Sequence, residues 1–417
     1  MEKKTQKNLK FPDGFLWGSG TSAHQVEGHN HNDWTEWEKE NAKRLAQHSK
    51  KYWEKSQHLF PEMGLESNYI SGCACDHYNR YEEDFDIAKS LGQNAYRFSI
   101  EWSRIEPEEG VFNEQAIEHY RQVIWALKKR GIEPFVTLWH WTLPYWIAKM
   151  GGWEKRKTID YFLRYTEKII EELGDDVKFW ITLNEPEIFS GNCYLKGIRP
   201  PQKKNILSYL RVIKNLIKAH KSSYKIIKKI NPNSRIGIAK NNIYFEAYKN
   251  RITNLFLKKF IDWWWNFYFL NKIKNQQDFI GLNYYFHNRI NKGFNKNENK
   301  NTTDMGWEIY PEGIYHVLKN LKKYNLPIYI IENGIADAKD EKREKFIKDH
   351  LYWIHKAIKE GVDIKGYFYW SLLDNFEWDK GFWPRFGLVE IDYQTMNRKI
   401  RPSALEYKKI IEKNAIE

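Results

Sequence analysis

The fold of this chain is decided by the stretch Lys178-Phe-Trp-Ile-Thr-Leu-Asn-Glu-Pro-Glu187. It has the pattern of a short apolar strand that stops at a carboxylate, and Pro327-Ile-Tyr-Ile-Ile-Glu-Asn-Gly334 repeats that pattern. Strands rich in Ile, Phe, Trp and Tyr pack inside a fold. In a barrel of such strands, the polar residue at each C-terminal end reaches the mouth, where chemistry takes place. The two stretches therefore predict that Glu185 and Glu332 face one cavity.

Outward from these stretches, apolar runs alternate with amphipathic segments eight times along the chain. The expected strands are Phe15 to Ser22, Ala95 to Trp102, Pro134 to Trp139, Lys178 to Leu183, Arg235 to Ala239, Asp278 to Asn283, Pro327 to Ile331 and Lys365 to Trp370. The expected helices include Tyr81 to Leu91, Asn113 to Arg130, Thr158 to Leu173, Leu207 to Ile230, Pro311 to Tyr324 and Glu341 to Glu360. Several end at glycine, the usual C-terminal signal: Gly92, Gly131, Gly174 and Gly361.

Eight strand and helix units predict an α/β protein whose parallel strands close into a TIM (β/α)8 barrel with helices outside. An open doubly wound sheet would need a Gly-rich phosphate loop after the first strand. The turn there has the sequence Ser19-Gly-Thr-Ser-Ala-His-Gln-Val-Glu27 instead. No linker or low-complexity tract divides the 417 residues. We therefore expect a single barrel domain spanning residues 1–417.

The remaining composition argues against several other classes of protein. The Lys-rich start of the chain lacks an apolar signal segment, and no stretch approaches the length of a membrane span, so we expect a cytoplasmic protein and no membrane partner. Three cysteines do not indicate a disulfide framework, and Cys73-x-Cys75 with His77 lacks a second ligand cluster, so we expect no metal. The net charge of +13 is interpreted as solvated lysines spread over the helices, often beside Glu or Asp, and not as a nucleic-acid site.

The strand ends deliver polar and aromatic side chains to the same mouth. In chain order they are Gln25, Arg97, His140, Asn184 with Glu185, Asn241, Asn283 with Tyr285, Glu332 and Trp370. A lone histidine or tryptophan is more often part of a core. Together, however, these residues indicate a sugar pocket, because hydroxyls need amide, carboxylate and imidazole partners while an indole stacks on the ring. Two carboxylates on separate strands are the minimum equipment for splitting a glycosidic bond.

The chain resembles the family 1 glycoside hydrolases, the β-glucosidase and β-galactosidase family, from Phe11 to about Arg401. The motifs that carry this resemblance are Phe11-Pro-Asp-Gly-Phe-Leu-Trp-Gly18, Asp76-His-Tyr-Asn-Arg-Tyr-Glu-Glu-Asp84, Asn94-Ala-Tyr-Arg-Phe-Ser-Ile-Glu-Trp-Ser-Arg-Ile105, Leu138-Trp-His-Trp141, Thr182-Leu-Asn-Glu-Pro186, Asp278-Phe-Ile-Gly-Leu-Asn-Tyr-Tyr285, Ile331-Glu-Asn-Gly334 and Trp370-Ser-Leu-Leu-Asp-Asn-Phe-Glu-Trp378.

The resemblance implies that Glu185 is the general acid/base and Glu332 the nucleophile of a retaining reaction, in which the carboxyls lie about 5 to 5.5 Å apart. Arg97 and Tyr285 resemble the partners that keep Glu332 ionised and positioned. Asn184 resembles the donor to the sugar's 2-hydroxyl, with Asn283 as a further supporting residue. The family's ligands of the sugar hydroxyls are matched by Gln25, His140, Glu377 and Trp378. The aromatic floor on which the sugar stacks is matched by Trp370, and the wall beside the leaving group is matched by Trp307.

Three departures from the family pattern stand out. Ile331 precedes the nucleophile where the family usually carries Thr, which affects fine positioning more than chemistry. The segment from Asn241 to Gln277 is shorter than usual and holds Trp263-Trp264-Trp265; we expect it to help frame the entrance. Trp139 and Trp141 flank His140, which would tighten the pocket wall.

The implied activity is a retaining β-glycosidase that hydrolyses non-phosphorylated β-glycosides or oligosaccharides from the non-reducing end without a cofactor. One alternative is a 6-phospho-β-glycosidase, but Glu377 would repel the phosphate, and Lys380 is the one cation noted nearby. The other alternative is a catalytically silent sugar-binding barrel, which need not retain the supporting residues. The choice among glucose, galactose and fucose, the natural leaving group and a homo-oligomeric state stay open.

Overall fold

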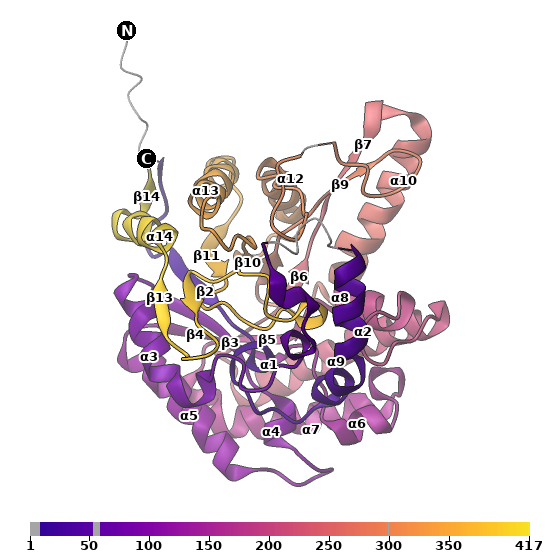
Figure 1. Cartoon of the computed structure of the whole chain (residues 1–417), viewed down its shortest axis with the longest axis vertical. Coiled ribbons are helices and arrows are strands. Elements are labelled where there is room, and N and C mark those ends of the chain that lie inside the picture. Colours follow the sequence, from indigo (N-terminus) through magenta and orange to yellow (C-terminus); the bar gives the residue numbers. More distant parts are fainter. Residues whose placement is uncertain (1–8, 53–58, 299) are drawn as a thin grey trace.

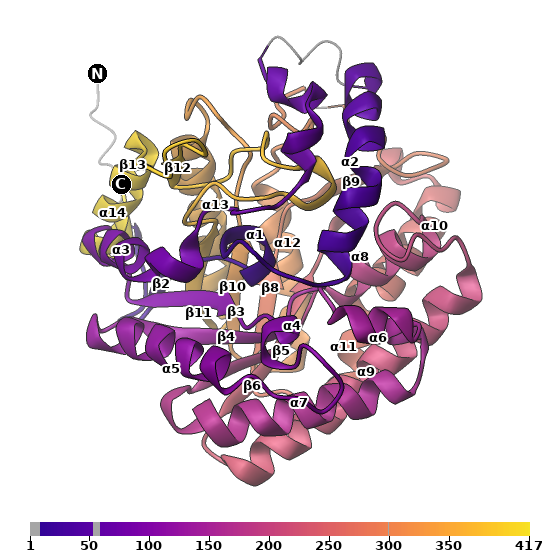
Figure 2. The ribbon, with the colours of Figure 1, turned by 60° about the horizontal axis from the view of Figure 1, so that its bottom comes forward.

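The computed structural model describes residues 9–52, 59–298 and 300–417. Eight parallel strands close a barrel in the order β10-β11-β2-β3-β4-β5-β6-β8, which confirms the predicted TIM barrel. The strands are β2 Leu16–Gly20, β3 Ala95–Ser99, β4 Glu133–Trp139, β5 Phe179–Asn184, β6 Arg235–Asn241, β8 Ile280–Asn283, β10 Ile328–Asn333 and β11 Ile364–Trp370. Figures 1 and 2 show the helices surrounding these strands.

The helices cover the barrel and build the rim of its mouth. In chain order they are α1 Ala23–Val26, α2 Asp33–Tyr52, α3 His77–Ser90, α4 Trp102–Ile105, α5 Glu114–Lys129, α6 Tyr145–Lys149, α7 Lys157–Leu173, α8 Pro186–Ser190, α9 Ile206–Ile230, α10 Ile252–Asp262, α11 Tyr268–Ile273, α12 Glu312–Leu321, α13 Arg343–Lys359 and α14 Pro402–Lys413. All six expected helices are present within a few residues, whereas α2, α10 and α14 were not anticipated.

The ends of the helices follow local signals in the sequence. The Asn113 side chain accepts hydrogen bonds from the first backbone N–H groups of α5, as a helix N-cap does. At the other end Gly131 adopts a φ of 67°, a left-handed conformation that ends the helix. Gly174 was expected to act in the same way, but its φ is −64° and the chain continues into a short 3-10 turn. That expectation was wrong in its mechanism, although α7 does end at Leu173.

Apolar side chains fill the interior of the barrel below the C-terminal ends of its strands. Phe135 and Phe179 stack with ring centroids 4.1 Å apart, and Ile331 belongs to the same buried cluster. Above this apolar plug, a cavity remains at the C-terminal ends of the strands. A larger apolar shell between the strands and the helices contains residues from Phe11 to Ile416. The single-domain division itself stays a prediction.

Three small sheets complete the structure. β1 (Leu9–Lys10) pairs antiparallel with β14 (Ala415–Ile416), so the two ends of the described chain lie side by side (Figure 1). β12 (Val389–Ile391) pairs antiparallel with β13 (Arg398–Ile400). β7 (Tyr244–Ala247) pairs parallel with β9 (His287–Ile290). The β7–β9 pair extends strands β6 and β8 beyond the barrel and carries α10 at the rim.

Candidate active site

A cavity of about 220 Å³ opens at the C-terminal end of the barrel. Glu185 enters it directly after β5, and Glu332 enters it from β10. Ten of the twelve predicted site residues line this cavity: Gln25, His140, Asn184, Glu185, Tyr285, Trp307, Glu332, Trp370, Glu377 and Trp378. The other two, Arg97 and Asn283, are fully buried behind it. The structure therefore brings all twelve residues together.

Glu332 is held by positive charge and by a hydroxyl. The guanidinium of Arg97 donates through Nη1 to Oε1 of Glu332, and the Tyr285 hydroxyl donates to Oε2 over 2.9 Å. The other arm of Arg97 donates to Oδ1 of Asn184 over 2.7 Å. Because these partners occupy both carboxylate oxygens, the side chain of Glu332 is fixed in orientation. Charge-assisted bonds of this kind are stronger than neutral ones.

Glu185 has uncharged partners instead. The amides of Asn241 and Asn283 each donate to its Oε1 over 2.9 Å, so Oε2 is the oxygen left to carry a proton. Burial and, after it, the nearby charge of Glu332 raise the pKa of Glu185 to about 7, although the two amides and Arg97 oppose the rise. Near neutral pH this carboxyl is therefore protonated in a large share of molecules. Asn241 was recognised as a strand-end residue but not as a partner of Glu185.

His140 lines the cavity beside Asn184. Since Oδ1 of Asn184 accepts from Arg97, the Asn184 amide nitrogen faces His140 and donates to its Nε2 over 3.0 Å. The proton of the neutral imidazole then lies on Nδ1, which has no partner among the described residues. Burial and the charge of Arg97 hold the pKa of His140 well below its usual value. The ring is therefore neutral near neutral pH.

The opposite side of the cavity carries Gln25 and Glu377. The Gln25 amide donates to the backbone oxygen of Phe376 over 2.9 Å and to Glu377 Oε2 over 3.3 Å. Burial raises the pKa of Glu377 to about 8, and Arg199 opposes this rise. Arg199 also lines the cavity and pairs with Asp379 at 2.7 Å, beside the Lys380–Asp379 pair at 2.8 Å. Lys380 is therefore not the one cation near Glu377, and that expectation was wrong.

Aromatic rings form the remaining walls. Trp370 lies 6.1 Å from His140 in a stacked arrangement, and Trp307 packs edge-on against Phe286 at 4.7 Å. Trp141 donates its indole N–H to the backbone oxygen of Asn184 and lines the cavity. Trp139 does not line the cavity, since it packs behind the wall against Trp153, with ring centroids 5.1 Å apart. Only one of the two tryptophans that flank His140 therefore shapes the pocket.

The Trp263-Trp264-Trp265 run is absent from the described cavity walls. Trp263 follows α10, and its side chain is 45% exposed on the outside. Asn241, at the start of the segment expected to frame the entrance, does line the cavity. Several wall residues could not be recognised from the sequence, because they lie in loops and short helices without strand-end patterns: Ile188, Asn192, Ile198, Arg199, Phe286, Met305 and Phe386.

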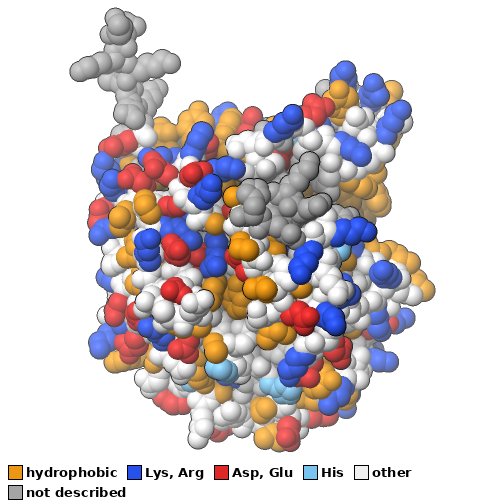
Figure 3. All heavy atoms as spheres, in the orientation of Figure 1, with side chains coloured by type: hydrophobic (Ala, Val, Ile, Leu, Met, Phe, Trp, Pro, Cys, Tyr) orange, Lys and Arg blue, Asp and Glu red, His pale blue; other side chains and the backbone are white. Residues whose placement is uncertain are grey.

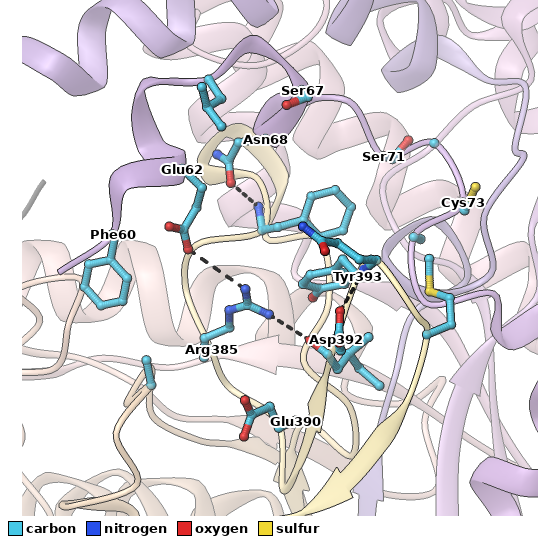
Figure 4. A pocket seen from close by; sticks show the side chains of 18 of the residues that line it. Phe60, Glu62, Ser67, Asn68, Ser71, Cys73, Arg385, Glu390, Asp392 and Tyr393 are labelled. Atoms are coloured by element: carbon cyan, nitrogen blue, oxygen red, sulfur yellow. Dashed lines mark hydrogen bonds and ion pairs between the residues drawn. The ribbon is translucent and has the colours of Figure 1, made fainter. Parts of the chain in front are cut away.

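A larger hollow of about 820 Å³ lies away from the carboxylates (Figure 4). Arg385 lies within it, between Glu62 at 3.9 Å and the backbone oxygen of Ile391 at 3.3 Å. Neither catalytic candidate lines this hollow, so size does not mark the reactive site. We found no group of three potential metal ligands within the described ranges, and His77 pairs with Asp84 at 2.7 Å. None of the described helices is long and apolar enough to cross a membrane.

Comparisons with known proteins agree with this geometry. The family model for glycosyl hydrolase family 1 matches residues 7–270 and 253–416. The β-glucosidase A of Thermotoga maritima is 36% identical and is covered over 99% of its length by 98% of this chain. The solved β-glycosidase from Pyrococcus horikoshii is 38% identical with a TM-score of 0.88, covering 98% of this chain and 96% of that one.

A solved β-glucosidase from Thermotoga maritima in complex with glucoimidazole is 33% identical, with a TM-score of 0.85, and the match covers 98% of this chain and 100% of that one. These matches extend over the whole barrel and both carboxylate motifs. The chain belongs to glycosyl hydrolase family 1.

Proposed function

We propose that this glycoside hydrolase is a retaining β-glucosidase in which Glu185 is the general acid/base and Glu332 the nucleophile. The observation that carries the proposal is the contrast between the two carboxyls. Uncharged amides and burial surround Glu185 and raise its pKa to about 7, whereas a guanidinium and a phenol hydroxyl bind Glu332. One protonated and one ionised carboxyl in a shared cavity are the pair that retaining glycosidases need.

In the first step, Glu332 attacks the anomeric carbon while the bond to the leaving-group oxygen breaks. Oε2 of Glu185 gives its proton to that oxygen, so the leaving group departs as a neutral alcohol. The sugar remains bound to Glu332 as a covalent ester. Tyr285 and Arg97, which held the Glu332 carboxylate, preserve its orientation for the attack.

In the second step, the ionised Glu185 removes a proton from water, and the water oxygen bonds to the anomeric carbon as the bond to Glu332 breaks. Two displacements at the same carbon return the starting configuration. The reprotonated Glu185 and the free Glu332 carboxylate are then ready for another cycle. The step requires no group other than the two carboxyls and water.

The sugar-binding end supports an unphosphorylated hexose. His140 offers a neutral imidazole, and Gln25 with Glu377 offers a bidentate amide and carboxyl partner for adjacent hydroxyls. Trp370 and Trp378 supply flat apolar surfaces for the ring. The name of the Thermotoga maritima relative, a β-glucosidase, supports glucose as the preferred sugar.

The experiment that tests the proposal combines a nitrophenyl β-glycoside panel with product stereochemistry. We expect hydrolysis of the β-glucoside to exceed that of the α-glucoside by orders of magnitude, and proton NMR to detect β-glucose as the first product. First release of α-glucose would refute retention. Faster hydrolysis of the β-galactoside or β-fucoside would correct the sugar and leave the mechanism in place.

A further inference from the structure

Helix α10 exposes most of its apolar side chains. Of its eleven residues, only Asn254 is buried. Along the outer side, Ile252 is 72% exposed, Phe256 72%, Phe260 60% and the following Trp263 45%. Single exposed apolar residues are normal on a protein surface, but a group of large ones is a sign of a binding surface.

These four residues, here called the α10 stripe, lie on one face of the helix. Their spacing of four, four and three residues keeps them within a narrow sector at 3.6 residues per turn. The rings of Phe260 and Trp263 are 6.3 Å apart, and Trp263 lies 6.0 Å from Trp264.

The apolar surface continues beyond α10 to the first turn of α9. Trp264 donates its indole N–H to the Tyr209 hydroxyl over 2.9 Å. The neighbouring Ile206 and Leu207 are exposed at the start of that helix. Exposed apolar side chains therefore occur both on α10 and at the start of α9.

Positive charge is concentrated in the same part of the chain. Between residues 188 and 277 the sequence holds nineteen Lys and Arg residues against two acidic ones, Glu246 and Asp262. Of the 67 basic and 54 acidic residues, this leaves 48 basic against 52 acidic residues elsewhere, so the segment accounts for more than the whole excess of +13. The excess positive charge is thus concentrated in this segment. This differs from the expectation that the lysines are spread over the helices. Around the stripe, Lys249, Arg251 and Lys259 are exposed.

Figures 1 and 2 place α10 at the periphery of the molecule, away from the barrel strands. In the space-filling view, orange apolar side chains and blue Lys or Arg side chains occur together at the upper right, where α10 lies in Figure 1 (Figure 3). The helix that carries the stripe is therefore on a projecting part of the molecule.

We propose that the α10 stripe docks this protein onto a membrane surface rich in anionic phospholipids. Aromatic and aliphatic side chains on one face, with Lys and Arg beside them, are the combination that lies in the interface between headgroups and acyl chains. Anionic headgroups complement the local excess of positive charge. Docking of this kind needs no spanning helix, and it revises the expectation that the protein has no membrane partner.

The position of α10 gives such docking a consequence for the active site. The chain enters β7 and α10 from the C-terminal end of β6, where Asn241 donates to Glu185. The stripe and the cavity are therefore at the same end of the barrel. A docked molecule would present its cavity from the membrane-facing end, where amphiphilic glycosides collect.

The test is co-sedimentation of the whole protein with vesicles. Vesicles of equal parts phosphatidylglycerol and phosphatidylcholine should carry the wild-type protein down, while vesicles of phosphatidylcholine alone should bind it much less. Phe256→Ser combined with Phe260→Ser should lower the partition coefficient at least about tenfold, because two large apolar side chains no longer enter the interface. Leu405→Ser combined with Tyr352→Ser, at exposed positions on α14 and α13, is the matched control and should bind as the wild type does.

A second pair of variants separates the charge contribution. Lys258→Gln with Lys259→Gln should weaken binding to anionic vesicles, whereas Lys408→Gln with Lys409→Gln, a half-buried and exposed pair of the same kind on α14, should not. Unchanged circular dichroism and unchanged hydrolysis of a water-soluble nitrophenyl β-glucoside establish that each variant is folded.

Three results would overturn the proposal. The first is a wild-type protein that does not sediment with anionic vesicles, or a Phe256/Phe260 variant that sediments equally well. The second is a wild-type dimer in light scattering that becomes a monomer in the Phe256/Phe260 variant, which would make the stripe an interface between two copies. The third is a DNA mobility shift that survives moderate salt and is lost in the Lys258/Lys259 variant alone, which would assign the charge to nucleic acid.

Discussion

Glu185 and Glu332 are the same amino acid, and their neighbours prepare them for different work. The amides of Asn241 and Asn283 leave Glu185 without a cation in direct contact, and burial raises its pKa to about 7. Arg97 contacts Glu332 instead. This difference comes from neighbours on three strands, β3, β6 and β8, so a change at any one of these neighbours should alter the chemistry.

Replacing Glu332 tests the nucleophile. Glu332→Gly should reduce turnover by several orders of magnitude, because the covalent intermediate cannot form. Added azide or formate should restore part of the activity by entering the space left by the side chain, and azide should give the α-glycosyl product. NMR of that product is the measurement. Activity near that of the wild type without added anion would remove Glu332 from this role.

Replacing Glu185 tests the acid. Because only the protonated form can donate, kcat/KM should fall as pH rises through about 7, the pKa of Glu185. Glu185→Ala should abolish this alkaline limb and slow substrates with poor leaving groups by about 10²- to 10⁴-fold, while nitrophenyl glycosides lose far less. Glu185→Gln keeps the shape without the proton and should behave similarly. Equal losses for both kinds of substrate would argue against an acid role.

We expect Glu377 to set the discrimination against 6-phosphorylated sugars. Burial raises its pKa to about 8, so its repulsion of a phosphate should strengthen as pH rises through that value and the carboxyl becomes ionised. The ratio of kcat/KM for nitrophenyl β-glucoside to that for its 6-phosphate should exceed one and grow between pH 7 and pH 9, since effects of Glu185 cancel in the ratio. Glu377→Ser should weaken hydrolysis of the plain sugar and flatten this growth. A wild-type preference for the phosphate, assisted by Arg199 and Lys380, would overturn the assignment.

At the scale of elements, strands β8 and β10 approach each other closely beneath the site. A Cβ on Gly281 would come within 2.4 Å of Cδ1 of Ile331 and 2.7 Å of the backbone oxygen of Ile238. Ile331, which stands where the family usually has Thr, thus fills the space that a side chain at position 281 would occupy. Two residues further along β8, Asn283 donates to Glu185.

Gly281→Ala should therefore cost about 1–3 kcal/mol of stability by overpacking, and it should also disturb Asn283 and Glu332. We expect a lower melting temperature, together with a lower kcat in the fraction that remains folded. Gly191→Ala is the control, because that glycine has a φ of −64° and no atom within 4 Å of an added Cβ. Similar losses in both variants would show that the close approach of β8 and β10 is not the cause.

At the scale of the whole molecule, Asn414 ties the C-terminal end to the start of the barrel. Its amide donates to the backbone oxygen of Phe11 over 3.0 Å, and its Oδ1 accepts from the Trp17 indole over 2.9 Å. Its φ is 49°, a left-handed conformation that Asn tolerates better than most residues. These bonds hold β1 against β14 and cover the N-terminal side of the barrel.

Asn414→Ala should lower the free energy of unfolding by about 2–4 kcal/mol, because it loses both side-chain bonds and strains the backbone. Asn414→Gly loses the same bonds but accepts the backbone conformation, so its loss should be smaller. Denaturant titration measures both, and specific activity should stay unchanged because the site lies at the other end of the barrel. An equal loss in the two variants would mean that backbone strain plays no part.

The sequence by itself determined the barrel and its eight strands, and it predicted twelve site residues that the structure places in or directly behind one cavity. The spacing of apolar residues and the polar residue that follows each strand are local properties of the sequence. Buried apolar runs that end at Glu185 or Glu332 can therefore be recognised without coordinates. The family motifs extended this recognition to Glu377 and Trp307, which lie outside the strands.

Tertiary structure alone decided which of these residues touch and what surrounds them. Arg199 carries no sequence signal, and it reaches the cavity because a loop folds back over the mouth and pairs it with Asp379. The two-residue strands β1 and β14 are too short to show a period, and only the closure of the barrel brings them together. The apolar residues of α10 have the pattern of a helix that packs on a core, yet the fold turns that face outward. The physical reason is common to all three: burial and partnership depend on segments far apart in sequence, which no local pattern encodes.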